Sequence, residues 1–115
     1  MRSRLNDLVL QGAKTATAGL LEEYTRESEQ VEHVGERLAL LDDAGRRVAT
    51  VEITGVDVQR LADVPWEFAR AEGEGDEDLA AWRSGHERHW AAAGTPVSDG
   101  THVVCLRLRV VDDGS

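Results

Sequence analysis

Hydrophobic residues recur at helical spacing near the start of the chain. Leu5, Leu8 and Val9 fall on one helical face of residues 2–11, which predicts a short amphipathic helix. Gly12 follows at the place where a helix commonly ends in a left-handed residue. The residues immediately after Gly12 are therefore expected to lie in a turn.

A second stretch with helical spacing follows this turn. Leu20, Leu21 and Tyr24 lie along one face of residues 18–27, so the pattern predicts another short helix. Residues 28–34 are polar and have no clear period. They are expected to form a loop.

Alternation of apolar and polar residues replaces helical spacing from position 37. Residues 37–41 and 46–54 flank a turn that ends at Gly45, which predicts a β-hairpin with one apolar face. Gly55 is expected to break or bulge the second strand, after which residues 56–58 continue in extended form. The apolar face of the second strand consists of Ala49, Val51 and Ile53.

The last strand is predicted over residues 101–111, where apolar residues again alternate with others. Its leucine side, with Leu106 and Leu108, is expected to face the core. Arg107 and Arg109 then project from the opposite side. They form either a solvated strand face or a contact to phosphate.

Two helices are predicted between these strands. Asp63 precedes Val-Pro and suits the start of a helix that stops at Gly73, because a carboxylate caps free amides and Pro is tolerated in the first turn. Asp76 is the expected cap of the next helix, residues 79–93. Glu72 would lie at a helix C-terminus, where a negative charge is unfavourable.

The helix over residues 79–93 carries an aromatic stripe. Trp82, His86 and Trp90 are spaced four apart, a pattern more typical of core packing than of a platform for stacking bases. His86 and His89 share a helix, yet Cys105 is the only thiol and no second pair of ligands accompanies them. No metal site and no cofactor are therefore predicted.

Composition narrows the class of protein. A chain of 115 residues predicts one domain, residues 1–115, with a single core. The net charge of -9, from 22 acids and 13 bases, disfavours duplex DNA as a partner, because that affinity comes from Lys and Arg contacts to phosphates. No apolar run approaches a membrane span and no signal-peptide pattern is present, so a cytoplasmic protein without membrane attachment is expected.

Lys14 is the only lysine in a chain with twelve arginines. A primary amine can lose its proton when it is buried and then act as a base, whereas a guanidinium effectively cannot. The residue lies in the turn predicted after Gly12, beside the hydroxyls of Thr15 and Thr17. Lys14 is therefore a candidate for a chemical role.

Motifs spread over nearly the whole chain resemble the ASCH domain family, in particular its bacterial branch with the sequence Glu-Gly-Glu-Gly-Asp. In chain order, the motifs are Gly12-Ala-Lys14-Thr15-Ala-Thr17, Val34-Gly35-Glu36, Phe68-Ala-Arg-Ala-Glu72-Gly-Glu74-Gly-Asp76, Trp82-x-x-x-His86 with Trp90, and Val103-Val104-Cys105. The resemblance implies an α+β, PUA-like fold: a small mixed β-barrel flanked by short helices. It also implies an RNA-related function, with RNA cleavage in some members and hydrolysis of N4-acylated cytidine in others.

The family motif maps a catalytic group onto Lys14, Thr17 and Glu72. Thr17 would attack an amide carbonyl and Lys14 would accept the proton, while Glu72 would either protonate the leaving amine or orient a water. If Lys14 and Glu72 pair directly, Lys14 instead stabilises a tetrahedral oxyanion and Glu72 is the base. The sequence leaves both assignments open.

The fuller family pattern places an arginine at position 19, where this chain has Gly19. Any substrate contact that this arginine makes is either missing here or supplied by another residue, such as Arg107 or Arg109. The chain also starts almost directly at its first helix, whereas members of this branch usually carry extra residues there. The residues expected to contact substrate are Thr15, Glu74, Trp82, His86, Arg107 and Arg109.

The expected function is hydrolysis of RNA, as a ribonuclease, or of a modified nucleoside such as N4-acetylcytidine. The alternative is a module that binds RNA or a nucleotide without reacting. The expected partner is RNA or a small nucleoside. The oligomeric state, and whether Glu72 or Glu74 faces the pocket, stay open.

Overall fold

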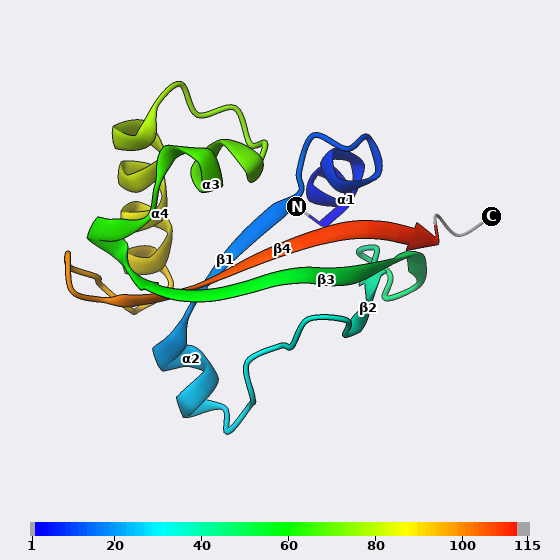
Figure 1. Ribbon diagram of the computed structural model, residues 1–115, viewed down its shortest axis with the longest axis horizontal. Coiled ribbons are helices and arrows are strands. Elements are labelled where there is room, and N and C mark those ends of the chain that lie inside the picture. The colour runs from blue at the N-terminus through cyan, green and yellow to red at the C-terminus, as the bar shows by residue number, and fades with distance from the viewer. Residues whose placement is uncertain (1, 113–115) are drawn as a thin grey trace.

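A curled sheet of antiparallel strands forms the centre of the computed structural model, which describes residues 2–112 (Figure 1). The strands are β1 (Ala16–Leu20), β2 (Arg37–Leu41), β3 (Arg47–Arg60) and β4 (His102–Asp112). The helices are α1 (Arg2–Leu10), α2 (Leu21–Arg26), α3 (Trp66–Ala71) and α4 (Leu79–Ala92), with a 3-10 turn at Leu61–Asp63.

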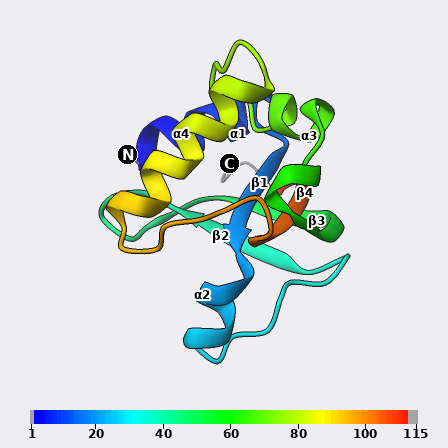
Figure 2. The same ribbon diagram turned by 90° about the vertical axis from the view of Figure 1, so that its left-hand side faces the viewer.

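The sheet has the strand order β1-β4-β3-β2, and each neighbouring pair is antiparallel. The long strands β3 and β4 curve together into a half-barrel. Helices α1, α3 and α4 lie on one side of the sheet, and α2 with the loop after it lies on the other (Figures 1 and 2). The predicted α+β class and the predicted hairpin are confirmed, including an irregularity in pairing between Ile53 and Gly55.

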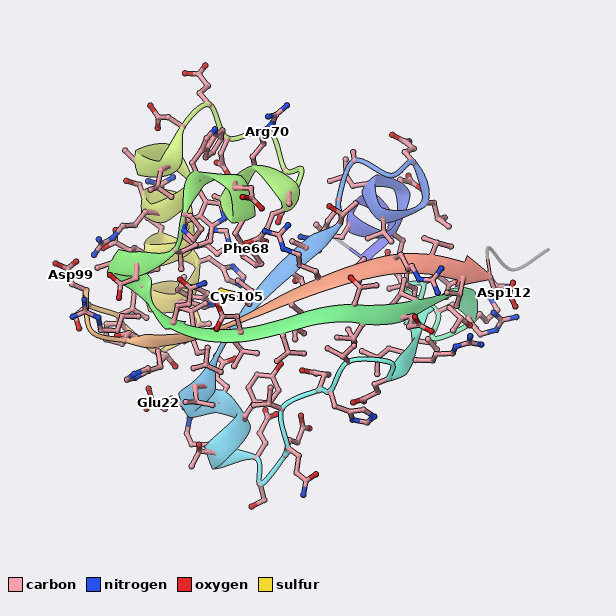
Figure 3. The ribbon with its side chains drawn as sticks, in the orientation of Figure 1. Glu22, Phe68, Arg70, Asp99, Cys105 and Asp112 are labelled. Carbon is pink, nitrogen blue, oxygen red and sulfur yellow. The ribbon has the colours of Figure 1, made fainter. Side chains whose placement is uncertain are left out.

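The middle of β4 is buried on both faces, so the expectation of one solvated face is wrong there. Val103 and Cys105 pack with Phe68 and the other apolar residues of α3 and α4, and Figure 3 shows Phe68 and Cys105 in the interior between α3 and the sheet. Val104 and Leu106 pack on the other side, in the cluster that α2 covers. Two small cores therefore meet at one strand.

The predicted helix over residues 18–27 begins later than expected. Ala16–Leu20 forms β1, which pairs with β4 from Leu20 opposite Val103 to Ala16 opposite Arg107. Only Leu21–Arg26 is helical. The alternate residues Ala16 and Leu20 are both fully buried, so pairing with β4 outweighs the weak local pattern.

The expected cap residues of the two later helices are also wrong. Asp63 lies in the 3-10 turn and pairs with the guanidinium of Arg60 at 2.8 Å, while Pro65 precedes α3 without a side-chain cap. Asp78 rather than Asp76 caps α4, since its carboxylate accepts the backbone N–H of Ala81 at 2.8 Å. Asp76 therefore does not cap α4, and it lines the pocket described below.

None of the helices in the described part of the chain combines the length and apolar character that crossing a bilayer requires.

Replacing Asp78 by Ala should lower the free energy of unfolding by about 1 kcal/mol, because α4 loses the acceptor for one of its free N–H groups. Chemical denaturation measures this change. The matched control is Asp76→Ala, which removes the same charge two residues earlier and leaves the cap intact. Equal losses in the two variants would contradict the assignment of the cap.

Candidate active site

Lys14 lies in a tight turn between α1 and β1. Gly12 adopts a positive φ of 79°, and the N–H groups of Ala13 and Lys14 both donate to the carbonyl of Leu8 at 3.0 Å. The next residue, Thr15, donates its N–H to the carbonyl of Ala71 at 2.8 Å. The turn is therefore tied both to α1 and to the end of α3.

The amine of Lys14 is buried between two carboxylates, with 6% of the residue exposed. Nζ lies 3.0 Å from Oε2 of Glu74, 3.2 Å from Oε2 of Glu72 and 3.4 Å from the carbonyl oxygen of Glu72. An ammonium has three N–H donors, and here each of them has an acceptor. This geometry holds Lys14 as a cation, so it favours a charge-stabilising role over that of a proton acceptor.

Glu72 receives donors on both carboxylate oxygens. Oε2 accepts from Lys14, while Oε1 accepts from Nε1 of Trp82 at 3.0 Å and lies 3.2 Å from Nε2 of His86. Burial of this 2%-exposed residue tends to raise the pKa of the carboxyl, but the contacts from His86, Lys14 and Trp82 hold it below the ordinary value. These contacts also explain an acidic residue at the C-terminus of α3.

His86 is held between two tryptophans of the same helix. Its ring stacks on Trp82 with centroids 4.3 Å apart and meets Trp90 edge-on at 5.1 Å. Nδ1 lies 3.0 Å from the carbonyl of Trp82, while Nε2 faces Glu72. Both ring nitrogens face acceptors, an arrangement that only the doubly protonated imidazolium satisfies. Although burial lowers the pKa of His86, the contact with Glu72 raises it above the ordinary value.

Gly73 is the residue that lets the acidic loop close on Lys14. It has a positive φ of 68°, and a Cβ atom at this position would lie 2.0 Å from the carbonyl oxygen of Ala13. Backbone therefore touches backbone here, and no side chain fits between the two segments. The position of Glu72 and Glu74 around the amine depends on this contact.

A pocket of about 390 Å³ opens beside Lys14 at the edge of the sheet formed by β1. Thr17 lines it together with Glu72, Glu74 and Asp76. Its remaining walls are Leu5 of α1, Ala18 of β1, and Gly85, His86, His89 and Trp90 of α4. The residues predicted to form the catalytic group thus share one cavity, called the Lys14 pocket below.

Comparison with known proteins gives a family assignment. The ASCH domain family matches residues 1–112. The chain belongs to the ASCH domain family.

Two solved structures resemble this ASCH domain. The crystal structure of an ASCH domain from Lactobacillus crispatus JV V101 is 29% identical, has a TM-score of 0.81, and covers 96% of this chain and 72% of its own. A protein from Enterococcus faecalis V583 is 32% identical, has a TM-score of 0.82, and covers 95% of this chain and 68% of its own. No curated protein is similar in sequence.

The family is generally RNA-associated, and the fold of this chain matches the PUA-like fold of its structural neighbours. The predicted family and fold class are confirmed. The matches to known proteins identify no substrate and no reaction for the Lys14 pocket. Both must be argued from the chemistry of the residues that line it.

Of the six residues expected to contact substrate, Glu74 and His86 line the Lys14 pocket. The other four do not line it. Thr15 is exposed and its hydroxyl donates to the carbonyl of Ala71 at 3.4 Å. Trp82 is fully buried, so it supports Glu72 from behind and offers no surface for stacking a base. Arg107 pairs with Glu67 at 3.1 Å, away from this pocket.

Arg109 pairs with Glu52 at 3.0 Å and does not line the pocket either. Neither strand arginine therefore replaces the arginine of the family pattern. At that position, a Cβ on Gly19 would meet the ring of Tyr24 at 3.6 Å. A side chain there would extend toward α2.

Sequence reasoning missed Asp76, His89 and Trp90 as pocket residues. The sequence favours a cap role for Asp76, which precedes α4, and a core position for Trp90, which the structure also shows in the core. His89 follows His86 by three residues, a spacing that does put both on neighbouring parts of one helix face. This spacing is the feature of the sequence that could have identified His89 as a pocket residue.

Within residues 2–112, no cluster of three or more His, Cys, Asp and Glu side chains is arranged to hold a metal ion. The single thiol is also unsuited to nucleophilic chemistry. Burial and the nearby charge of Asp57 raise the pKa of Cys105 to about 11.

Replacing Gly73 by Ala should displace the acidic loop and separate both glutamates from Lys14. Gly75→Ala is the matched control, because Gly75 also has a positive φ, of 92°, but has no atom within 4 Å of the added Cβ. Both variants carry the strain of a left-handed Ala, about 1–2 kcal/mol. Chemical denaturation should show a clearly larger loss for Gly73→Ala, and equal losses would contradict the role of the contact.

The His86–Glu72 contact predicts a pH-dependent stability. Because the pKa of His86 is raised from 6.5, its contribution is fully present below that value and is lost as pH rises through the raised pKa. Because the pKa of Glu72 is lowered from 4.5, its contribution is present above that value and is lost as pH falls through the lowered pKa.

The free energy of unfolding should therefore differ most between wild type and His86→Gln from about pH 4.5 to 6.5. The difference should shrink at higher pH. Denaturation curves across this range measure it. Parallel pH profiles of the two proteins would show that the contact carries no charge.

Proposed function

We propose that this ASCH domain hydrolyses the amide of a small modified nucleoside such as N4-acetylcytidine in the Lys14 pocket. The observation that carries the proposal is the buried ammonium of Lys14, held by two carboxylates in a cavity that Thr17 also lines. A cation, a hydroxyl and a carboxylate are the groups that acyl transfer from an amide requires.

The charge of the pocket supports a neutral small substrate rather than an RNA strand. Lys14 and a protonated His86 are offset by Glu72 and Glu74, and Asp76 adds a further negative charge. An anionic backbone gains little from such surroundings. Arg107 and Arg109, the candidates for phosphate contacts, are instead paired with glutamates outside this pocket.

Glu74 is the better proton acceptor of the two glutamates. Glu72 has donors on both oxygens and a lowered pKa, which makes it a weak base. Glu74 is 29% exposed at its side chain, and only one of its oxygens has a donor among residues 2–112. In this scheme Glu72 orients Lys14, and Glu74 takes the proton.

Proton transfer to Glu74 would also release Lys14 for catalysis. A protonated Glu74 attracts the ammonium less strongly, because its negative charge is gone. One N–H of Lys14 then becomes available to the oxygen of the substrate carbonyl as that oxygen becomes negative.

The reaction proceeds in two balanced halves. In the first half, the hydroxyl oxygen of Thr17 bonds to the carbonyl carbon and its proton passes to Glu74. The C–N bond then breaks as Glu74 returns that proton to the leaving amine. Water then attacks the acyl-threonine ester by the same route and releases the carboxylic acid. One water and one amide give one acid and one amine.

The direct test incubates the protein with N4-acetylcytidine and measures cytidine by chromatography. Lys14→Met should reduce the rate by about 10²–10³-fold, as expected for loss of an oxyanion-stabilising group. Lys14→Arg should keep part of the rate because it keeps the cation, and Glu74→Gln should lose more than the exposed control Arg109→Met. Full activity in Lys14→Met, or none in wild type, would refute the proposal.

The runner-up is binding of a nucleotide without reaction, which the RNA association of the family favours. Binding alone needs the pocket but no proton acceptor. Calorimetry with N4-acetylcytidine separates the two functions, because a binding module would retain affinity and release no cytidine.

A further inference from the structure

The free edge of β1 lies at the Lys14 pocket. The strand stands at one end of the sheet and has β4 on its other side. Successive side chains of a strand point to opposite faces of the sheet, yet the neighbours Thr17 and Ala18 both line this pocket. A cavity that touches both faces of one strand wraps around its edge. The unpaired edge of β1 therefore opens into the Lys14 pocket.

The register of β1 shows which residue presents its backbone at that edge. The N–H of Leu108 donates to the carbonyl of Thr15 at 3.0 Å. In an antiparallel pair, residues turned toward the partner strand alternate with residues whose N–H and C=O point away from it. Thr15 and Thr17 are thus turned toward β4. Ala18 directs both its N–H and its C=O out of the free edge.

The two backbone groups of Ala18 lack a protein partner. Ala16, the other residue of β1 with this orientation near the pocket, is fully buried, whereas Ala18 is half-buried. Among the described residues, no group on another element forms a hydrogen bond to the N–H or C=O of Ala18. Backbone groups are strong donors and acceptors that require partners. Ala18 therefore offers one donor and one acceptor, side by side, to a molecule in the pocket.

The position of these groups is fixed by the surrounding structure. Ala18 lies opposite Cys105 of β4, and its side chain packs against the core that α3 and α4 cover. The strand is held on one edge by β4 and on one face by the core. Groups on such a rigid element are well placed to orient a ligand.

A donor and an acceptor side by side match a flat ring that carries the complementary pair on adjacent atoms. An N4-acylated cytosine has such an edge: the ring nitrogen N3 is an acceptor, and N4–H is a donor attached to the same carbon. The edge is open when the acyl group turns toward C5. In the same orientation, uracil would place its N3–H against the N–H of Ala18 and its carbonyl against the carbonyl.

The geometry points to Ala18 as the residue that binds the base, with its N–H donating to N3 and its C=O accepting from N4–H. This inference rests on the proposed function for the identity of the ligand, and it adds how that ligand is recognised. Ala18 then holds the nitrogen of the amide that is cleaved, while the hydroxyl of the preceding residue, Thr17, lines the same pocket. Holding the two reacting partners together in this way lowers the barrier.

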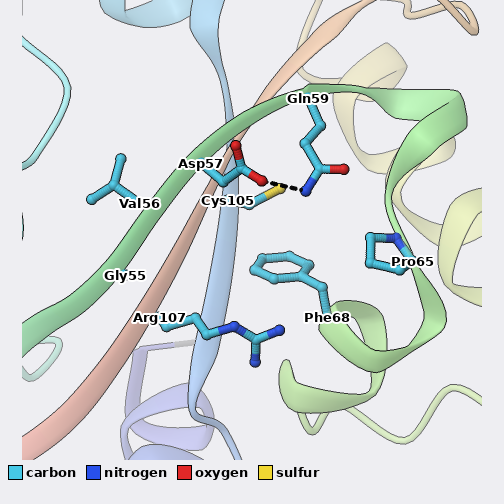
Figure 4. Close-up of a pocket in the computed structure, with 8 residues that line it drawn as sticks. All are labelled: Gly55, Val56, Asp57, Gln59, Pro65, Phe68, Cys105 and Arg107. Atoms are coloured by element: carbon cyan, nitrogen blue, oxygen red, sulfur yellow. Dashed lines mark hydrogen bonds between the residues drawn. The ribbon is translucent and has the colours of Figure 1, made fainter.

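A second hollow, of about 300 Å³, is the competing place for a nucleoside. It lies between β3 and α3 (Figure 4), and it shares no lining residue with the Lys14 pocket. Cys105, the pairing partner of Ala18, lines it, as does Gln59 of β3. A nucleoside bound there would depend on Gln59 and not on the free edge of β1. Gln59→Ala is therefore the control for this hollow.

The test measures binding of cytidine by calorimetry. Cytidine carries the same N3 and N4–H but no acyl group, so its binding can be measured whether or not the protein hydrolyses an amide. An analogue with C–H in place of N3, 3-deazacytidine, should bind wild type at least about tenfold more weakly. The pyrimidin-2-one nucleoside, which lacks the 4-amino group, should lose a similar factor. These two comparisons require no change in the protein.

An ester at Ala18, with lactic acid in place of the alanine, removes the N–H and keeps the side chain. The preference for cytidine over 3-deazacytidine should then disappear, because the donor that distinguishes them is gone. The matched control is the same ester at Ala39, which is exposed on the free edge of β2 and whose N–H points away from β3 by the same alternation. This control and Gln59→Ala should both keep the tenfold preference.

Equal affinity of wild type for cytidine and 3-deazacytidine would overturn the inference, as would a preference that survives the ester at Ala18. Absence of cytidine binding at millimolar concentration, or loss of binding in Gln59→Ala, would overturn it too. The proposed hydrolysis fails separately: if the preference depends on Ala18 but N4-acetylcytidine is not cleaved, the recognition stands and the reaction does not. Cleavage without that preference would give the opposite result.

Discussion

The buried ion pair between Lys14 and Glu72 organises the helical side of this protein. The two residues are 58 positions apart, and each is almost wholly removed from solvent. Isolated buried charges are costly, so each must be surrounded by partners of opposite charge or by hydrogen bonds. The turn after α1, the end of α3 and the middle of α4 meet at this point because each supplies one of those partners.

The same constraint explains why several local rules are broken here. An acid at the C-terminus of α3 is locally unfavourable, yet Glu72 gains contacts from Lys14, Trp82 and His86. Gly73 has a left-handed backbone conformation, and because it has no side chain, two backbone segments can touch there. Local conflicts of this kind are expected at a functional site.

The sequence predicts the hairpin, the long helix and the group around Lys14, because each depends on regular spacing or on residues with distinctive chemistry. Strand β1 is not predictable in this way, since the sequence Ala-Thr-Ala-Gly-Leu has little strand character and pairs only because β4 lies beside it. The partners of Arg107 and Arg109 lie 40 and 57 residues away. Only the folded chain shows that these arginines serve ion pairs outside the Lys14 pocket.

The chain contains one lysine, so selective labelling with ¹⁵N-lysine gives a single side-chain ammonium signal that reports the central contact directly. The measurement is the rate at which the ammonium protons of Lys14 exchange with water at neutral pH. The account predicts slow exchange in wild type and in Gly75→Ala, and faster exchange in Gly73→Ala, because burial between Glu72 and Glu74 shields those protons. Exchange in wild type as fast as that of a lysine in open water would contradict the account.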